Sequence, residues 1–157
     1  MRVTSMRWTQ VVGVAAVLFA VCAGAAVKAA AQAPAAGPGT TVWAGVYTDE
    51  QAKRGEAVAA KLCTSCHGPD LSGGEAGPAL VGLEFIGNWN ALSTADFFDR
   101  VHATMPADAP GTLTPQQTSD VMAYVLKLNK YPAGQTELPT DLAALKNIKI
   151  EGQPPAK

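Results

Sequence analysis

The segment that most restricts how this 157-residue chain can fold is residues 68–90, which is dense in glycine and contains two prolines. Glycine and proline both disfavour the interior of a regular helix or strand, so we expect a long irregular loop here. No alternating run of apolar residues indicates a strand elsewhere in the chain. The sequence therefore predicts a small all-α domain in which short helices surround a Gly/Pro-rich loop.

Three helices are predicted from apolar residues at helical spacing and from the polar residues that precede them. They extend over about residues 49–62, 93–104 and 114–129. The first and the third begin with a threonine that is followed three residues later by glutamine, the pattern of a capping box. Gly55 lies inside the first helix, where glycine costs about 1 kcal/mol relative to alanine, so we expect another part of the backbone to approach it closely.

Three short helices and a long loop bury little apolar surface. A domain of this size usually needs an additional source of stability, such as a metal, disulfides or a cofactor. A large, flat and apolar cofactor would supply the missing part of the core.

The N-terminal residues 1–31 have the pattern of a secretory signal peptide. Basic residues near the start are followed by an uncharged apolar run over residues 11–27, and alanines at 29–31 fit a cleavage site. The alternative is a retained membrane anchor, although the apolar run is at the lower limit for spanning a bilayer. Cleavage predicts a periplasmic domain, and a membrane association is expected only if this segment stays attached.

The rest of the chain divides into three segments. Residues 32–47 are rich in alanine, proline, glycine and threonine and predict a flexible leader. Residues 48–130 contain the predicted helices and form the folded domain, and residues 131–157 predict a mostly irregular C-terminal tail. Removing residues 1–31 takes away three of the 12 Lys and Arg residues, which leaves nine against 13 Asp and Glu, a net charge of −4. We expect no nucleic-acid partner, because phosphate binding needs a basic patch.

The sequence Cys63-Thr64-Ser65-Cys66-His67 is a C-x-x-C-H motif, the attachment signature of c-type haem. Two cysteines one helical turn apart face the same way, so both thiols can add to the vinyl groups on one side of a porphyrin. The histidine that follows can then place its imidazole beneath the ring as an iron ligand. The motif occurs once and predicts one covalently attached haem c.

Three other chemistries use two cysteines at this spacing. A thioredoxin-like redox pair should lie near a βαβ pattern, and none is present. A zinc site needs a fourth nitrogen or sulfur ligand, for which only His102 remains once Cys22 leaves with the signal segment. A plain disulfide does not explain why a histidine follows directly.

Over about residues 47–130 the chain resembles a class I cytochrome c. The resemblance rests on the C-x-x-C-H motif, on Gly77-Pro78-Ala79-Leu80, which is similar to a G-P-x-L segment of that family, and on Met105-Pro106 after a helix. It implies that the first and last helices cross at Gly55, with Tyr124 packed there. It also implies that the Pro78 carbonyl accepts the imidazole N–H of the haem-ligating histidine, which fixes the ring.

The remaining candidate residues each have a structural alternative. Met105 is predicted as the sixth iron ligand because it lies beside Pro106 after a helix, although methionine more often fills a core, as expected for Met122. His102 is the rival ligand. Trp89 could donate its indole N–H to a haem propionate, or it could be a buried aromatic residue.

These features predict single-electron transfer through a His67- and Met105-ligated haem c. The protein would act as a carrier or as the electron-accepting subunit of a dehydrogenase. Residues 105–137 resemble cytochrome domains found with periplasmic quinoprotein dehydrogenases, so such an enzyme or a terminal oxidase is the expected redox partner. The alternative is a haem enzyme or gas sensor, which requires a displaceable distal ligand.

Overall fold

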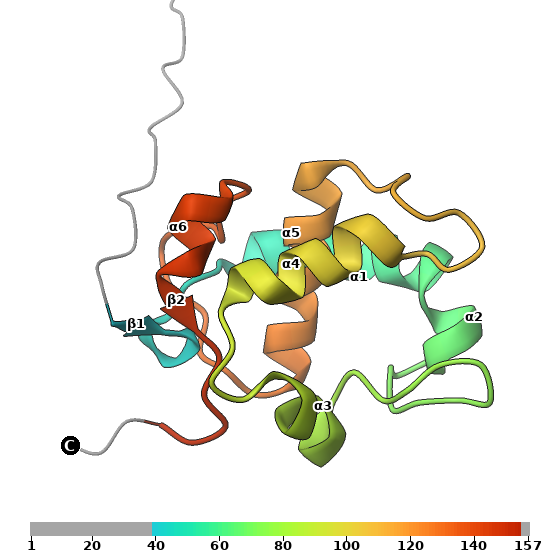
Figure 1. Cartoon of the computed structure of the whole chain (residues 1–157), viewed down its shortest axis with the longest axis horizontal. Helices are drawn as coiled ribbons and strands as arrows, with labels where there is room; N and C mark the ends of the chain where they lie inside the picture. The colour runs from blue at the N-terminus through green and yellow to red at the C-terminus, as the bar shows by residue number, and fades with distance from the viewer. Residues whose placement is uncertain (1–38, 155–157) are drawn as a thin grey trace, which may run out of the picture. The chain divides into compact units, whose positions relative to one another are not determined.

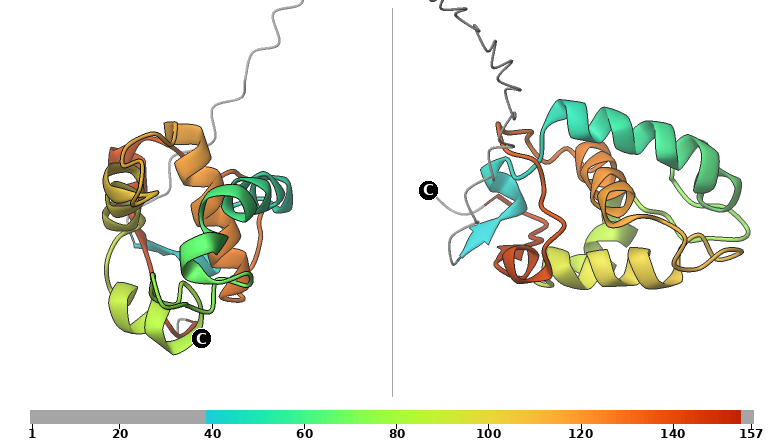
Figure 2. Two further views of the ribbon diagram at one scale, coloured as in Figure 1. Left: turned by 90° about the vertical axis from the view of Figure 1, so that its right-hand side faces the viewer. Right: turned by 90° about the horizontal axis from the view of Figure 1, so that it is seen from above.

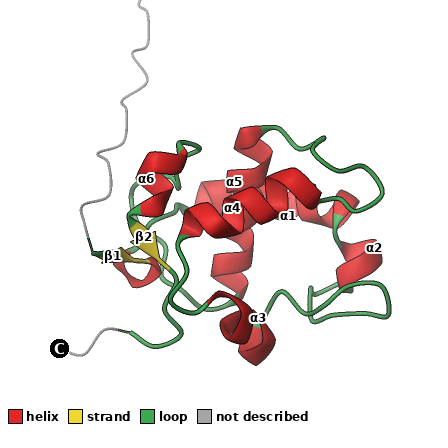
Figure 3. Cartoon of the chain, in the orientation of Figure 1, coloured by secondary structure: helices red, strands yellow, loops and turns green. Residues whose placement is uncertain are grey.

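The computed structural model describes residues 39–154, so the predicted signal segment and the start of the leader lie outside the described residues. Figures 1 and 3 show a mainly helical domain with a small two-stranded sheet at one end, which confirms the all-α fold class. Within the described part of the chain, no helix is long and apolar enough to cross a membrane. The elements in chain order are β1 (Thr40–Thr41), the 3-10 helix η1 (Val42–Ala44), α1 (Asp49–Leu62), α2 (Thr64–His67), α3 (Gly82–Trp89), α4 (Thr94–Thr104), α5 (Pro115–Leu128), α6 (Leu142–Lys146) and β2 (Ile148–Lys149).

The three helices predicted from the sequence are confirmed as α1, α4 and α5, and their ends lie within a residue or so of the expected positions. Helices α4 and α5 begin with complete capping boxes, in which each cap side chain and its partner satisfy one another's backbone N–H groups. Helix α1 has only half of the predicted box. The Thr48 hydroxyl accepts from the Gln51 N–H, but the Gln51 side chain turns into the core instead.

Helices α1 and α5 cross at Gly55, as the resemblance implied (Figure 2). A Cβ added at Gly55 would overlap the backbone carbonyl of Asp120 and would lie 3.0 Å from Cβ of Tyr124. The glycine therefore lets two helix backbones come closer than any side chain would permit. This contact sets the position of α5, which forms one wall of the cavity described below.

Helix α3 lies inside the segment that was predicted to be irregular, and that prediction is wrong for residues 82–89. Phe85 and Trp89 are four residues apart and share one face of the helix. Their rings pack against Phe97 of α4, with centroid distances of 5.5 Å and 4.6 Å. This tertiary packing outweighs the cost of the two glycines in the helix.

The C-terminal tail is ordered, and most of it has no regular secondary structure, as predicted. It contains α6 and β2, and β2 pairs in parallel with β1 in the register Thr40 to Ile148. The predicted flexible leader is likewise ordered from Thr40 onward, where Val42 and Tyr47 are buried. The buried apolar residues of the tail are Leu138, Leu145, Ile148 and Ile150.

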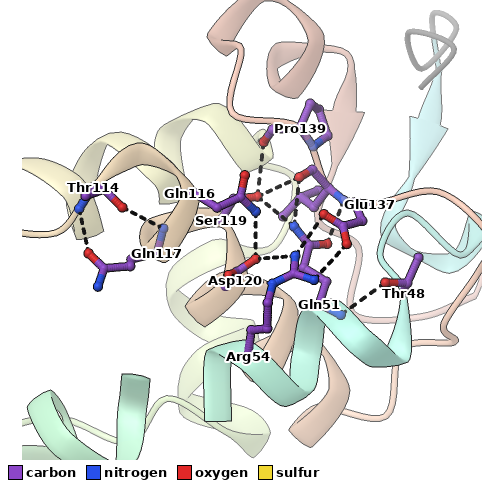
Figure 4. A network of polar contacts seen from close by, with 11 residues as sticks. Thr48, Gln51, Arg54, Thr114, Gln116, Gln117, Ser119, Asp120, Glu137 and Pro139 are labelled. Atoms are coloured by element: carbon purple, nitrogen blue, oxygen red, sulfur yellow. Dashed lines mark hydrogen bonds and ion pairs between the residues drawn. The ribbon is translucent and has the colours of Figure 1, made fainter. Parts of the chain in front are cut away.

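A buried polar contact joins the tail to the crossing helices (Figure 4). The Gln51 side chain accepts the Leu138 N–H at 2.7 Å and donates to the Leu138 carbonyl at 2.9 Å. The Ser119 hydroxyl donates to the same carbonyl at 2.6 Å. Because buried backbone groups are costly to leave unpaired, these side chains hold the start of the tail in one place.

An ion network lies beside this contact (Figure 4). The Arg54 guanidinium of α1 donates to both carboxylate oxygens of Asp120 on α5, at 3.0 and 2.9 Å, and to both of Glu137, at 2.9 and 2.8 Å. Hydrogen bonds to Asp120 and then to Glu137 raise the pKa of Arg54. The paired geometry links α1, α5 and the tail.

Candidate haem site

A cavity of about 580 Å³ lies among α2, α3, α4, α5 and the loops that join them. All six site residues predicted from the sequence contribute to its lining: Cys63, Cys66, His67, Pro78, Trp89 and Met105. Most of the other walls are apolar, and they include Leu62, Leu80, Leu92, Phe97, Val101, Leu113, Val121 and Val125. The volume is in the usual range for a ligand or cofactor site.

The two cysteines lie at the start of α2, directly after the end of α1. The helical turn is closed by hydrogen bonds from the N–H groups of Cys66 and His67 to the carbonyl of Cys63. Both thiols are free and half-buried on the cavity wall. Burial, and then the neighbouring Cys66, raises the pKa of the Cys63 thiol, so it is not poised as a reactive thiolate.

The His67 imidazole is 8% exposed and has one fixed orientation. Its Nδ1 donates to the Pro78 carbonyl at 2.8 Å, the contact that the resemblance implied. A Cβ at Gly77 would lie only 2.9 Å from the same nitrogen, so the absence of a side chain there lets the loop press against the ring. With Nδ1 occupied as a donor, Nε2 carries the free lone pair that a metal needs.

The loop that carries Pro78 is irregular but well ordered. Its backbone is closed by hydrogen bonds from Gly73 N–H to the His67 carbonyl at 2.8 Å and from Leu80 N–H to the Leu71 carbonyl at 2.8 Å. Leu71 is fully buried beneath it. The glycines of the loop thus serve close backbone approach rather than flexibility.

Met105 lies at the end of α4, where its N–H still bonds to the Val101 carbonyl and the following Pro106 takes the chain out of the helix. The side chain of Met105 reaches the cavity wall. His102, the rival ligand, is not part of the lining. Its Nδ1 lies 3.2 Å from the Thr118 hydroxyl and its ring packs against Phe98.

Trp89 is half-buried, and its ring packs against Phe97 on the cavity wall. Met122 is fully buried in the hydrophobic core, as expected. Arg100 also lines the cavity and was not predicted as a site residue from the sequence. Residues three or four positions apart share a face of a helix, and Arg100 is three residues after Phe97. Helical spacing alone therefore placed Arg100 on the same face of α4 as Phe97.

Comparison with known protein families finds a match over the residues that form this cavity. A protein-family profile described as cytochrome c oxidase, cbb3-type, subunit III matches residues 50–125, which carry the cysteines, the histidine and Met105. This match, together with the C-x-x-C-H motif and the helical fold, identifies residues 50–125 as a class I c-type cytochrome domain. A cytochrome of this class carries a covalently bound haem c.

Among solved structures, the cytochrome is similar to a chain of the sulfane dehydrogenase SoxCD from Paracoccus pantotrophus. The two are 28% identical, and the TM-score is 0.44. The alignment covers 57% of this chain and 53% of that chain, so the cytochrome matches about half of its length. No curated protein matches significantly.

The residues of the cavity fit haem c. Two thiols one helical turn apart can form the thioether bonds, and an imidazole with Nδ1 already occupied can bind iron through Nε2. The apolar walls suit a flat porphyrin, and they leave Leu62 and Leu92 40% and 42% exposed in the protein alone. The cofactor therefore supplies the part of the core that three short helices lack.

Proposed function

We propose that this cytochrome transfers single electrons through a haem c whose axial ligands are His67 and Met105. The observation that carries the proposal is that both side chains line one cavity, whereas His102 lies outside the lining and is engaged with Thr118. A site with both axial positions filled has no open position for a substrate. This supports electron transfer rather than catalysis or gas binding.

The residues of the chain would tune the redox chemistry that haem supplies. The Met105 thioether is a soft ligand that prefers ferrous iron, so it raises the reduction potential. The apolar walls act in the same direction, because a site of low polarity disfavours the more highly charged ferric state. The hydrogen bond from His67 to Pro78 fixes the plane of the imidazole during the redox change.

We further propose that the protein acts as a periplasmic carrier between a dehydrogenase and an oxidase. The tail buries most of its large apolar residues against its own domain, and Leu142 is the exception at 44% exposed. Leu83 of α3 is 92% exposed, and Asn88 and Trp89 of the same helix line the cavity. Together with the partly exposed Leu62 and Leu92 of the cavity lining, Leu83 offers a small apolar surface that suits a short-lived contact with a partner protein.

Size-exclusion chromatography of a native extract distinguishes the carrier from a permanent subunit. We expect the haem absorbance to elute at the mass of the cytochrome alone, because the tail uses most of its large apolar side chains within its own domain and leaves little apolar surface for a stable interface. Co-elution of the haem absorbance with a dehydrogenase, maintained at high salt, would contradict the carrier role and favour the subunit.

Replacing Met105 with alanine tests the proposed ligation. The variant should lose the weak near-infrared sulfur-to-iron band of the oxidised protein, should bind carbon monoxide when reduced, and should have a lower reduction potential. His102→Ala is the matched control on the same helix and should leave the band unchanged.

The reverse pattern would contradict the assignment. If Met105→Ala keeps the band while His102→Ala loses its low-spin spectrum, the distal ligand is His102. Rapid binding of carbon monoxide by the unaltered reduced protein would favour the haem enzyme or gas sensor over the carrier.

A further inference from the structure

We infer that Arg100 of α4 binds a carboxylate of the haem and keeps it ionised, so that the reduction potential is insensitive to pH near neutrality. The inference rests on the proposed function only in taking haem c as the occupant of the cavity. It assigns to this chain a cofactor contact that the sequence motifs do not specify.

The charges on the cavity wall point to this role. The Asp, Glu, Lys and Arg residues in the lining are Asp96, Arg100 and Asp108, so Arg100 is the one Lys or Arg side chain among them. None of the ion pairs in residues 39–154 involves Arg100. Asp96 forms no ion pair with Arg100, and its carboxylate instead accepts from the Ser93 N–H and hydroxyl at 2.9 and 2.7 Å.

The packing of α3 on α4 places a second donor at the same wall. The Trp89 ring lies 4.6 Å from that of Phe97, and Phe97 is three residues before Arg100 on one face of α4. Asn88, the neighbour of Trp89, also lines the cavity. An amide, an indole and a guanidinium thus all belong to the part of the lining that α3 and α4 contribute to a mainly apolar cavity.

The carboxylates of haem require polar or positively charged partners in the protein. Bonds to Cys63 and Cys66 hold the vinyl side of a porphyrin at α2, so its carboxylates must reach another wall. An ionised carboxylate is costly to bury without hydrogen bonds or a counter-charge. A guanidinium offers paired N–H donors that match the two oxygens of a carboxylate, and it stays charged at every physiological pH.

The expected pH dependence follows from the charge of that carboxylate. An ionised carboxylate favours the ferric state, so the reduction potential falls as pH rises through the range in which the carboxylate loses its proton. Arg100 keeps the carboxylate ionised below that range, which gives a flat profile near neutrality. Without Arg100 the carboxylate titrates at higher pH. The fall of the reduction potential with rising pH then lies in the range between about pH 5 and pH 7.5.

Spectroelectrochemical titration of the holoprotein from pH 5 to pH 9 tests the inference. In Arg100→Gln, at pH 8 and at a fixed applied potential, the ratio of reduced to oxidised haem should fall about tenfold, equivalent to about 59 mV for a one-electron couple. The ratio should recover as the pH is lowered. Arg100→Lys should retain most of the wild-type ratio, because the positive charge remains. Lys53 is an exposed residue of α1 outside the lining, and Lys53→Gln makes the same change in net charge. This control should alter neither the ratio of reduced to oxidised haem at pH 8 nor its dependence on pH.

A flat profile with an unchanged ratio in Arg100→Gln would overturn the inference, as would an equal response in Lys53→Gln. The near-infrared sulfur-to-iron band, recorded on the same samples, reports the axial ligands separately. If the band is present in every variant and the pH profile does not respond, the Arg100 assignment fails while the proposed ligation stands. Absence of the band in the unaltered protein would instead contradict the proposed ligation.

Discussion

Gly55→Ala should lower the free energy of unfolding by about 3 kcal/mol or more, a large fraction of the 5–15 kcal/mol typical of a folded domain. The added methyl group would overlap the carbonyl of Asp120, a backbone atom that cannot move unless α5 moves with it. Separating the helices would also disturb the Tyr124 contact and the wall formed by Val121 and Val125. Urea denaturation of the holoprotein, followed by circular dichroism, measures the loss.

Gly87→Ala is the matched control, because it makes the same substitution in another helix. A Cβ at Gly87 would have no neighbour within 4 Å, and alanine is the better helix former, so we expect a gain of about 0.5–1 kcal/mol. Equal effects at Gly55 and Gly87 would show that helix propensity, and not the crossing of α1 and α5, determines the outcome.

His67→Ala should abolish stable assembly of the holoprotein. The substitution removes the proposed iron ligand and also the ring that packs between the Pro78 carbonyl and Gly77. Without an axial bond on this side, the cofactor would no longer be fixed within the core that it completes. The measurements are the yield of haem-bearing protein and the optical spectrum of whatever is recovered.

His102→Ala removes the same type of side chain one turn before Met105. It loses only the contacts with Thr118 and Phe98, so the yield and spectrum of the holoprotein should stay close to those of the unaltered protein. Recovery of a well-folded, low-spin His67→Ala holoprotein would be incompatible with His67 as the proximal ligand.

The helices that could be predicted from the sequence are those whose determinants are local. Helices α1, α4 and α5 have apolar residues at regular spacing over 11 to 14 residues and caps within a few positions of their ends. Helix α6 has five residues and β2 has two, too few for a period to be visible. Their stability comes from partners far away in the sequence, such as the pairing of Ile148 with Thr40.

The site residues likewise differ in whether their determinants are local in the sequence. Cys63, Cys66 and His67 are consecutive members of one motif, so their shared chemistry is visible without a fold. Pro78 and Met105 became candidates only through their order along the chain and the resemblance to a family. Arg100 was missed because a charged residue on an amphipathic helix ordinarily faces solvent. The helical phase groups Arg100 with Phe97, but it does not show that this face of α4 borders a cavity, because that depends on how α3 and its aromatic residues pack against α4.

The contact between the two ends of the described chain has a consequence for how the domain is made. Trp43 donates its indole N–H to the carbonyl of Glu151, 108 residues further along, and β1 has no strand partner other than β2 within residues 39–154. Closing so long a loop is slow, and it must await the last part of the chain to be synthesised. The cysteine motif, by contrast, is complete well before that. Because no residue after Val125 lines the cavity that contains the two thiols, we expect haem attachment to be independent of the closure of this long loop.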